Sequence, residues 1–327
     1  MPEKVKAEFI EPMLLLRAES LPAGDEWLYQ LKLDGYRAIA FKTGRELQLR
    51  SRNNNDFAHR YPAVATALTA LPSETVIDGE IVAFDESGKP SFNLLQNHAS
   101  SGIPLVYFVF DVMVLSGRDV TREPLSKRQK LLADKILPKL AEPIRYSGEL
   151  GAPLPELVQS VKASGLEGLV AKRRDSVYEA GLRSGAWRKM RVNQGQEFVI
   201  GGYTLGGTTF DALIFGYYEN SELRYVARTR NGFTPGKRAE LMKRFNPLRT
   251  RECPFANLPE TRSGRWGQGF TAAKMKECQW LKPELVGQFE FREWTPDNHL
   301  RHSSFIALRD DKSPREVRRE VANLNRD

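Results

Sequence analysis

The sequence is poor in cysteine, in histidine and in long apolar runs. Its 327 residues include only two cysteines, Cys253 and Cys278, and four histidines. Two cysteines so placed fit neither a zinc-ligand spacing nor a disulfide framework, which disfavours a secreted, disulfide-stabilised protein. No apolar stretch is long enough to cross a bilayer, and no apolar core of a signal peptide follows Met1. These absences predict a protein of the reducing cytoplasm.

Internal repeats and low-complexity segments are also absent. The composition is 41% hydrophobic and 28% charged, which is typical of a globular chain rather than a disordered one. The length is sufficient for two domains. The net charge of +8 favours a polyanionic partner, although many basic proteins bind none.

The first part of the chain mixes strands and helices without the regular alternation of a Rossmann fold. Alternating or continuous apolar patterns predict strands over 27–33, 36–41, 47–53, 75–85, 105–115, 166–173 and 186–192. Helical periodicity predicts helices over 59–71, 92–98, 125–137 and 154–164, with Ser126 as an N-cap. We expect an α+β domain with largely antiparallel sheets over residues 1–193.

Asp34-Gly35 lies between the apolar runs 27–33 and 36–41. An Asp-Gly pair between two such runs is a strong hairpin signal. We therefore expect a hairpin that places Lys32 at a strand end, beside a tight turn, with its amine directed into a cleft.

The pattern changes near Asn193-Gln194-Gly195. Strands are expected over 197–204, 212–219, 222–228 and 284–295, with a turn at Asn220-Ser221 and one helix over 235–245. This inventory fits a five-stranded barrel of the OB type over residues 194–327. The basic segment 313–325 is expected to be helical.

Seven short charged or aromatic motifs punctuate the chain. Each has an ordinary explanation on its own, as a turn, a core strand, a solvated strand end or a surface charge run. In chain order they are Lys32-Leu33-Asp34-Gly35-Tyr36-Arg37, Arg50-Ser51-Arg52-Asn53, Asp78-Gly79-Glu80, Tyr107-Phe108-Val109-Phe110-Asp111, Glu167-Gly168-Leu169-Val170-Ala171-Lys172, Trp187-Arg188-Lys189-Met190-Arg191 and Arg309-Asp310-Asp311-Lys312.

In this order the motifs resemble motifs I, Ia, III, IIIa, IV, V and VI of the ATP-dependent DNA ligases, which are covalent nucleotidyltransferases. The resemblance extends from about residue 10 to the C-terminal end. It is closest to the bacterial stand-alone or end-joining class, LigD-like in its ligase domain, which resembles this chain also at 197–203 and 301–305.

The resemblance implies that Lys32 carries AMP and transfers it to the 5′-phosphate of a nick. Attack on ATP requires a free amine, whereas a solvated lysine titrates near ~10.4. Nearby cations and a bound metal would favour the neutral amine. The expected cations are Arg37, Lys172, Lys189 and Arg191. The expected ligands of Mg²⁺, or of Mn²⁺, are Glu80 and Glu167, with Asp34 as a possible third.

The resemblance also assigns the remaining nucleotide contacts. Gln30 and Leu31 precede the nucleophile at the nucleotide, and Phe110 is expected to stack on adenine. The other expected contacts are Arg52 with the ribose or the 5′-phosphate of the nick, Glu80 with the ribose, Lys189 and Arg191 with the α-phosphate, and Arg309, Asp311 and Lys312 with the pyrophosphate.

Two residues depart from the family pattern. Many relatives have Glu where this chain has Gln30, whose carbonyl oxygen is the weaker acceptor for the adenine amino group. The motif that ends in Arg191 more commonly ends in lysine, and a planar guanidinium binds phosphate differently.

Motif VI and the nucleophile fall in different predicted domains. We therefore expect a hinge near Gln194-Gly195 that closes the barrel onto ATP and later reopens it around DNA. Basic residues of the barrel are expected to contact backbone phosphates. They are Arg228, Arg230, Lys237 and Arg244, and a loop with Arg262, Arg265 and Trp266 is either a further DNA contact or an ordinary surface loop.

Other functions fit the same scaffold. One alternative is an RNA ligase or a capping guanylyltransferase, and another is a nucleic-acid-binding protein with an inactive transferase site. The intact lysine, both glutamates and motif VI argue against the second. The sequence leaves open nick repair against end joining and the tolerance for RNA. We expect a monomer at the nucleoid, without separate helical DNA-binding, polymerase or phosphoesterase modules, and with a Ku-like partner by family analogy alone.

Overall fold

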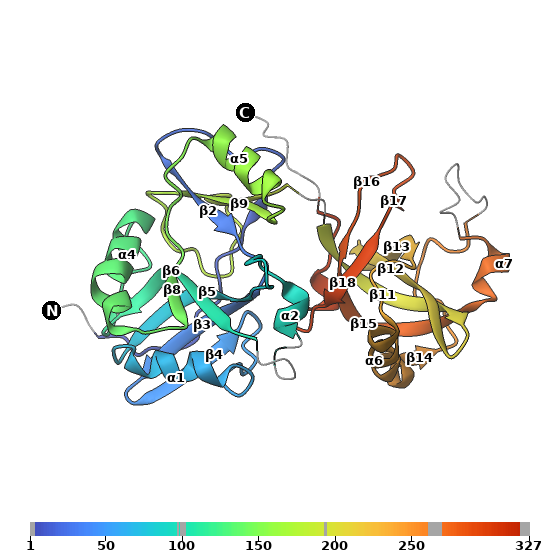
Figure 1. Cartoon of the computed structure of the whole chain (residues 1–327), viewed down its shortest axis with the longest axis horizontal. Helices are drawn as coiled ribbons and strands as arrows, with labels where there is room; N and C mark the ends of the chain where they lie inside the picture. The colour runs from blue at the N-terminus through green and yellow to red at the C-terminus, as the bar shows by residue number, and fades with distance from the viewer. Residues whose placement is uncertain (1–3, 97, 99–102, 193–194, 261–269, 321–327) are drawn as a thin grey trace. The chain divides into compact units, whose positions relative to one another are not determined.

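The computed structural model describes residues 4–96, 98, 103–192, 195–260 and 270–320 (Figure 1). These residues form two compact units, one up to residue 192 and one from residue 195 to 320. None of the described helices combines the length and the apolar character that a bilayer span requires.

The first unit contains two sheets. One has the order β1-β10-β9-β2, with bounds β1 Leu16–Arg17, β10 Trp187–Arg191, β9 Gly168–Arg173 and β2 Trp27–Lys32. The other has the order β4-β3-β5-β6-β7 with β8 beside β6, and its bounds are β4 Glu46–Ser51, β3 Tyr36–Thr43, β5 Thr75–Ala83, β6 Leu105–Leu115, β7 Arg118–Asp119 and β8 Ile144–Tyr146. All pairings are antiparallel except β1 with β10 and β6 with β8. The α+β prediction is confirmed.

The hairpin predicted at Asp34-Gly35 is wrong. β2 pairs with β9 in one sheet, whereas β3 pairs with β4 and β5 in the other. The two residues therefore carry the chain from sheet to sheet. Gly35 is buried against β5, where an added Cβ would lie 2.2 Å from the carbonyl oxygen of Ile81. The glycine is needed because two backbones approach closely here. An Asp-Gly pair is the same local signal whether it forms a hairpin turn or permits such an approach.

Helices lie in the four segments of the first unit where the periodicity predicted them. Their bounds are α1 Pro62–Ala67, α2 Phe92–Gln96, α4 Leu125–Leu131, which continues as a π-helical turn over Leu132–Ile136, and α5 Leu154–Ala163. The predicted helix over 59–71 thus begins only at Pro62, where proline is favoured because the first helical N–H has no helical partner. α5 lies beside β9 (Figure 1). Its residues Leu157 and Val161 belong to the same buried cluster as Leu169 and Ala171 of β9.

The N-cap predicted at Ser126 is wrong. α4 begins at Leu125, after Pro124, and has no side-chain cap. Two backbone carbonyls cap it instead, because the amides of Leu125 and Ser126 donate to the oxygens of Ser176 and Arg174. These acceptors are distant in the sequence, so no local signal marks them.

The second unit is a barrel built on one continuous sheet. Its order is β13-β12-β11-β15-β14, with β18 also beside β15, and its bounds are β11 Gly195–Gly206, β12 Thr209–Glu219, β13 Glu222–Thr229, β14 Arg249–Thr250, β15 Cys278–Glu290 and β18 Ser304–Leu308. The ribbon β16 Glu293–Trp294 and β17 Leu300–Arg301 and the helices α6 Pro235–Phe245 and α7 Ala272–Met275 complete it. Five of the sheet strands have five residues or more, in agreement with the predicted OB-type barrel, and β14 adds a two-residue strand.

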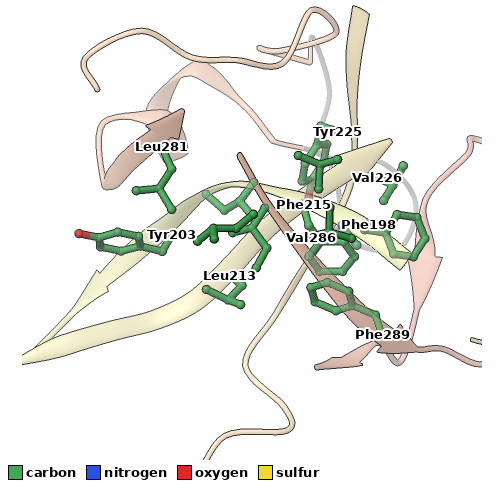
Figure 2. Packing of buried hydrophobic residues seen from close by; sticks show 14 of the residues in the cluster. Phe198, Tyr203, Leu213, Phe215, Tyr225, Val226, Leu281, Val286 and Phe289 are labelled. Atoms are coloured by element: carbon green, nitrogen blue, oxygen red, sulfur yellow. The ribbon is translucent and has the colours of Figure 1, made fainter. Parts of the chain in front are cut away.

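Aromatic residues fill the barrel (Figure 2). The rings of Phe215 and Phe289 stack with centroids 3.8 Å apart, and Phe198 lies against both at 5.3 and 5.9 Å. The predicted turn at Asn220-Ser221 joins β12 to β13, and both residues have positive φ, as a tight hairpin turn requires.

The helix predicted over 313–325 is wrong for the residues that the structure describes, and 321–325 lie outside them. Only a 3₁₀ turn, Pro314–Glu316, is present. The segment after it runs along the barrel, where the oxygen of Val317 accepts from the amide of Tyr218 and the side chain of Gln196 binds the backbone of Arg318 and Glu320. These contacts outweigh the local helical preference.

Candidate active site

Lys32 is the last residue of β2 and faces a carboxylate. Its Nζ donates to Oε2 of Glu167 at 2.7 Å, and Nε of Arg191 lies 2.9 Å from the other oxygen, Oε1. The strand register explains this geometry, because Lys32 and Arg191 both pair with Gly168, one from each neighbouring strand. Glu167 precedes Gly168 and therefore lies between the two cations. A Cβ at Gly168 would lie 2.0 Å from the oxygen of Met190, which excludes a larger residue.

Glu167 stays ionised in this arrangement. Burial alone would raise the pKa of its carboxyl group, but the charges of Lys32 and Arg191 outweigh burial and lower the pKa. A carboxylate with a lowered pKa is a weak base. Glu167 therefore orients the amine of Lys32 better than it could remove a proton from it.

A pocket opens beside Lys32. It is lined by Leu15, Gln30, Leu31, Lys32, Leu33, Arg37, Glu80, Phe110, Ser147, Val170, Lys172 and Trp187. The fold thus brings together seven of the predicted site residues, which come from five strands and from segments up to about 140 residues apart. Glu167 contacts Lys32, and Arg191 contacts Glu167, but neither Glu167 nor Arg191 lines the pocket. Arg52, Lys189 and Asp34 do not line it either.

Gln30 has a fixed orientation in this pocket. It is buried, and its Nε2 donates to the carbonyl oxygen of Ser147 at 2.5 Å. The amide oxygen therefore points away from Ser147 and remains the acceptor end of the side chain. This geometry suits the adenine contact that the sequence assigned to Gln30.

Arg37 is held by Asp78, a motif residue for which the sequence predicted no role, and by Tyr178, which lies outside the motifs. Its Nε and Nη2 lie 2.5 and 2.6 Å from the two carboxylate oxygens of Asp78, and the hydroxyl of Tyr178 donates to the same carboxylate at 2.6 Å. Asp78 is fully buried. Burial alone would lower the pKa of Arg37. The charge of Asp78 and its hydrogen bond outweigh the effect of burial, so the pKa of the guanidinium rises. The sequence did contain a signal for this contact, because Asp78 lies within an apolar strand and a buried acid needs a partner.

Lys172 lies between two aromatic rings. Its Nζ is 3.9 Å from the ring centre of Phe110 and 4.0 Å from that of Trp187, and only 3% of the residue is exposed. Among the described residues the ammonium has no hydrogen-bond partner. Burial lowers the pKa of Lys172 to about 7, and Asp111 opposes that shift. Phe110 is therefore in contact with cations here, since the Cζ of Arg37 also lies 4.7 Å from its ring centre.

Asp111, the residue after Phe110 in β6, forms a buried ion pair with Arg128. Asp111 accepts two hydrogen bonds of 2.8 Å from Nε and Nη2 of Arg128, and neither residue is exposed. Nη1 of Arg128 also donates to the carbonyl oxygens of Glu123 and Ser176. The pair joins α4 to β6 and to the loop after β9. Arg128 was not predicted as part of the site, because it lies on a helix with no visible link to the motifs.

The metal ligands predicted from the sequence have different surroundings. Glu80 lines the pocket, whereas both oxygens of Glu167 are bound by Lys32 and Arg191. Within the described part of the chain, no three His, Cys, Asp or Glu side chains form a metal-binding group. Mg²⁺ in nucleotide sites commonly takes one or two carboxylates together with phosphate oxygens. Glu80 fits that pattern directly, and Glu167 fits it only by sharing its oxygens.

Motif VI forms an ion cluster in the second unit. Arg309 donates two hydrogen bonds of 2.8 Å to Asp311, and Glu197 lies 3.8 Å from Arg309 and 3.6 Å from Lys312. Arg309 and Asp311 are both buried.

The four predicted DNA-contacting residues of the barrel all have internal contacts. Arg230 pairs with Asp211 at 2.7 Å, and Arg244 pairs with Asp310 at 2.9 Å. The Nζ of Lys237 donates to the oxygen of Ile306 at 2.5 Å, and Arg228 lies over the ring of Phe270. Arg262, Arg265 and Trp266 lie outside the described residues, as does Gln194 of the predicted hinge.

Comparisons with known proteins agree with this arrangement of motifs. Residues 12–191 match the family model "ATP dependent DNA ligase domain", and residues 206–312 match "ATP dependent DNA ligase C terminal region". The chain is 33% identical over 319 residues to "Multifunctional non-homologous end joining protein LigD" of Pseudomonas aeruginosa and 36% identical over 299 residues to the protein of that name from Mycolicibacterium smegmatis. These alignments cover 95% and 89% of this chain.

The chain spans 36% and 37% of the length of these two relatives. It is also similar to a solved structure, "mycobacterial DNA ligase D complexed with ATP and MES". That similarity has a TM-score of 0.69 at 32% sequence identity, and it covers 95% of this chain and 98% of the other.

Proposed function

Since the chain belongs to the family of ATP-dependent DNA ligases, we propose that it seals nicks in duplex DNA through an AMP carried on Lys32. The observation that carries this proposal is the position of Lys32. Lys32 lines a pocket together with Gln30, Glu80 and Phe110, and its amine is oriented by Glu167 at 2.7 Å.

Three displacements at phosphorus make up the reaction. The neutral amine of Lys32 attacks the α-phosphorus of ATP, a phosphoramidate bond forms and pyrophosphate leaves. A 5′-phosphate oxygen of the nick then attacks the same phosphorus and displaces the lysine amine. Finally the 3′-hydroxyl attacks the activated 5′-phosphate, the phosphodiester bond forms and AMP leaves.

The pocket residues contribute binding and charge to these steps. Gln30 offers its amide oxygen to the adenine amino group, and Phe110 offers a ring face once Arg37 or Lys172 turns from it toward phosphate. Cations near the α-phosphate stabilise the charge that develops there. Arg37, Lys172, Lys189 and Arg191 have this role in the proposal, and Arg52 contacts the ribose or the nick phosphate.

Mg²⁺ is part of the proposal, with Mn²⁺ as a substitute. Glu80 would hold the ion, and Glu167 would join it if its oxygens exchange from Lys32 and Arg191. When bound, the ion would neutralise phosphate charge and favour the neutral amine.

Arg309 and Lys312 would bind the leaving pyrophosphate. They belong to the second unit, so the first step requires that unit to approach ATP and the later steps require room for DNA. A hinge at the junction of the two units, near Gly195, would provide this motion.

The biological setting in this proposal is end joining and DNA repair. The names of the two relatives support it, and the net charge of +8 supports a nucleic-acid substrate. A Ku-like end-binding partner is included by analogy with the family.

A nick-sealing assay tests the proposal. Wild type and Lys127→Ala, a change at an exposed lysine paired with Glu123, should seal a nicked duplex with ATP, and Lys32→Ala should not. Duplexes with DNA or RNA on either side of the nick define the substrate. Sealing by Lys32→Ala at the wild-type rate, or labelling of the protein by GTP alone, would contradict the proposal.

A further inference from the structure

A carboxylate outside the seven motifs contacts both cations of motif VI. Oε1 of Glu197 lies 3.8 Å from Nη1 of Arg309 and 3.6 Å from Nζ of Lys312. The three side chains are 12%, 9% and 20% exposed, so the cluster is largely removed from water.

The barrel places these side chains together by its strand register. Glu197 on β11 pairs with Gln288 on β15, and Gln288 pairs with Ala307 on β18. Arg309 follows Ala307 by two residues and continues the ladder, because its amide donates to the oxygen of Val286. Residues two apart on a strand share a face, so Arg309 lies on the same face as Glu197.

The two carboxylates of the cluster hold the cations differently. Asp311 fixes Arg309 through two hydrogen bonds of 2.8 Å, whereas the contacts of Glu197 are about 1 Å longer. Burial would raise the pKa of Asp311, but Arg309 and Lys312 lower it, so this carboxylate stays ionised. Arg309 thus has a close partner in Asp311, and Glu197 lies within 4 Å of both Arg309 and Lys312.

We propose that Glu197 is a positioning residue for the first step of the reaction, which holds Lys312 beside Arg309 so that both reach the same pyrophosphate. The inference rests on the proposed function, since it assumes that motif VI binds the leaving group. A lysine side chain is long and flexible, and a neighbouring carboxylate restricts its directions. Contacts of this length can also be exchanged for phosphate when ATP arrives, whereas the Arg309–Asp311 pair keeps the guanidinium in place.

The test separates the first step from the last. Glu197→Gln keeps the shape of the side chain and removes its charge. Single-turnover adenylylation with ATP should slow by about 10-fold or more, because small displacements of a charged group reduce the rate strongly. Sealing of a nicked duplex that already carries AMP on its 5′-phosphate should be unchanged, since that step releases no pyrophosphate.

The matched control is Glu293→Gln. Glu293 pairs with Arg301 at 2.6 Å on the ribbon β16–β17 of the same barrel. This variant should adenylylate like wild type.

A double variant tests the link to Lys312. If Glu197 acts through Lys312, then Glu197→Gln combined with Lys312→Ala should be no slower in adenylylation than Lys312→Ala alone. Multiplied losses in the double variant would contradict the inference.

Wild-type adenylylation in Glu197→Gln, or an equal loss in both steps, would overturn the inference. If Glu197→Gln unfolds at a lower temperature than Glu293→Gln, Glu197→Asp replaces it and should adenylylate faster than Glu197→Gln. An equally slow Glu197→Asp would overturn the inference. Failure of wild type itself to accept AMP would instead refute the proposed function.

Discussion

Lys172 is a buried ammonium group that contacts two aromatic rings, and the described residues provide it with no hydrogen-bond partner. A charge in such a place disfavours folding, and it persists at sites where function requires it. The pKa of Lys172 is lowered to about 7 because burial disfavours its charged form. In the proposed reaction, the attraction between this ammonium group and a phosphate in the pocket offsets the unfavourable free energy of its burial.

Replacement of Lys172 by methionine should therefore stabilise the protein and abolish adenylylation. At pH 7 the free energy of unfolding should rise by about 2 kcal/mol or more, because methionine removes a buried charge and packs well against aromatic rings. Denaturant unfolding measures the first effect, and transfer of labelled AMP measures the second. Lys127→Met, at an exposed position, is the control.

The same pair of proteins should differ in its pH dependence. Below about pH 7 Lys172 holds its proton in both the folded and the unfolded state; between pH 7 and 10.5 only the unfolded chain holds it. Raising the pH through this window therefore favours folded wild type, and its stability deficit against Lys172→Met should shrink. A deficit that is constant from pH 7 to 10 would contradict the assignment.

At this scale the sequence predicted positions better than contacts. Lys32, Glu80, Phe110 and Lys172 were identified from short motifs, and Gln30 was identified from its place before the nucleophile. All five line one pocket. The partners that hold the site were not identified, because contacts such as that of Asp111 with Arg128 depend on how distant segments pack.

Elements whose signal is local were predicted well. β6 and α6 have the predicted bounds, since continuous apolar sequence and helical periodicity are properties of the segment itself. Elements whose ends depend on distant partners were not. The cap of α4 comes from carbonyls of the loop after β9, and the segment after Pro314–Glu316 follows the barrel surface.

The crossing at Gly35 gives a test at the scale of elements. A methyl group there would lie 2.2 Å from the oxygen of Ile81 and 2.9 Å from the side chain of Glu80, so β3 and β5 would have to separate. Gly35→Ala should lower the free energy of unfolding by about 3 kcal/mol.

Gly151→Ala is the control for this change, because a methyl group at Gly151 would have no described atom within 4 Å other than those of its chain neighbours. Its effect should be within about 0.5 kcal/mol. Denaturant unfolding compares both variants with wild type. Equal stabilities of Gly35→Ala and Gly151→Ala would show that β3 and β5 do not approach closely enough to exclude a methyl group at residue 35.

For the whole molecule, the proposed chemistry is divided between two units. The pocket with Lys32 belongs to the first, and the cluster of Glu197, Arg309 and Lys312 belongs to the second. The sequence order of the motifs predicted this division of labour. It did not predict that two of the basic residues chosen for DNA contact, Arg230 and Arg244, would form surface ion pairs, because charge alone does not reveal partners such as Asp211 and Asp310.

The proposed mechanism depends on one covalent bond, and mass spectrometry of the protein after incubation with ATP and Mg²⁺ tests for that bond most directly. We predict that one AMP is added and that fragmentation places it on Nζ of Lys32, in wild type and in Glu293→Gln alike. An unmodified protein, or AMP attached to any other residue, would contradict the account.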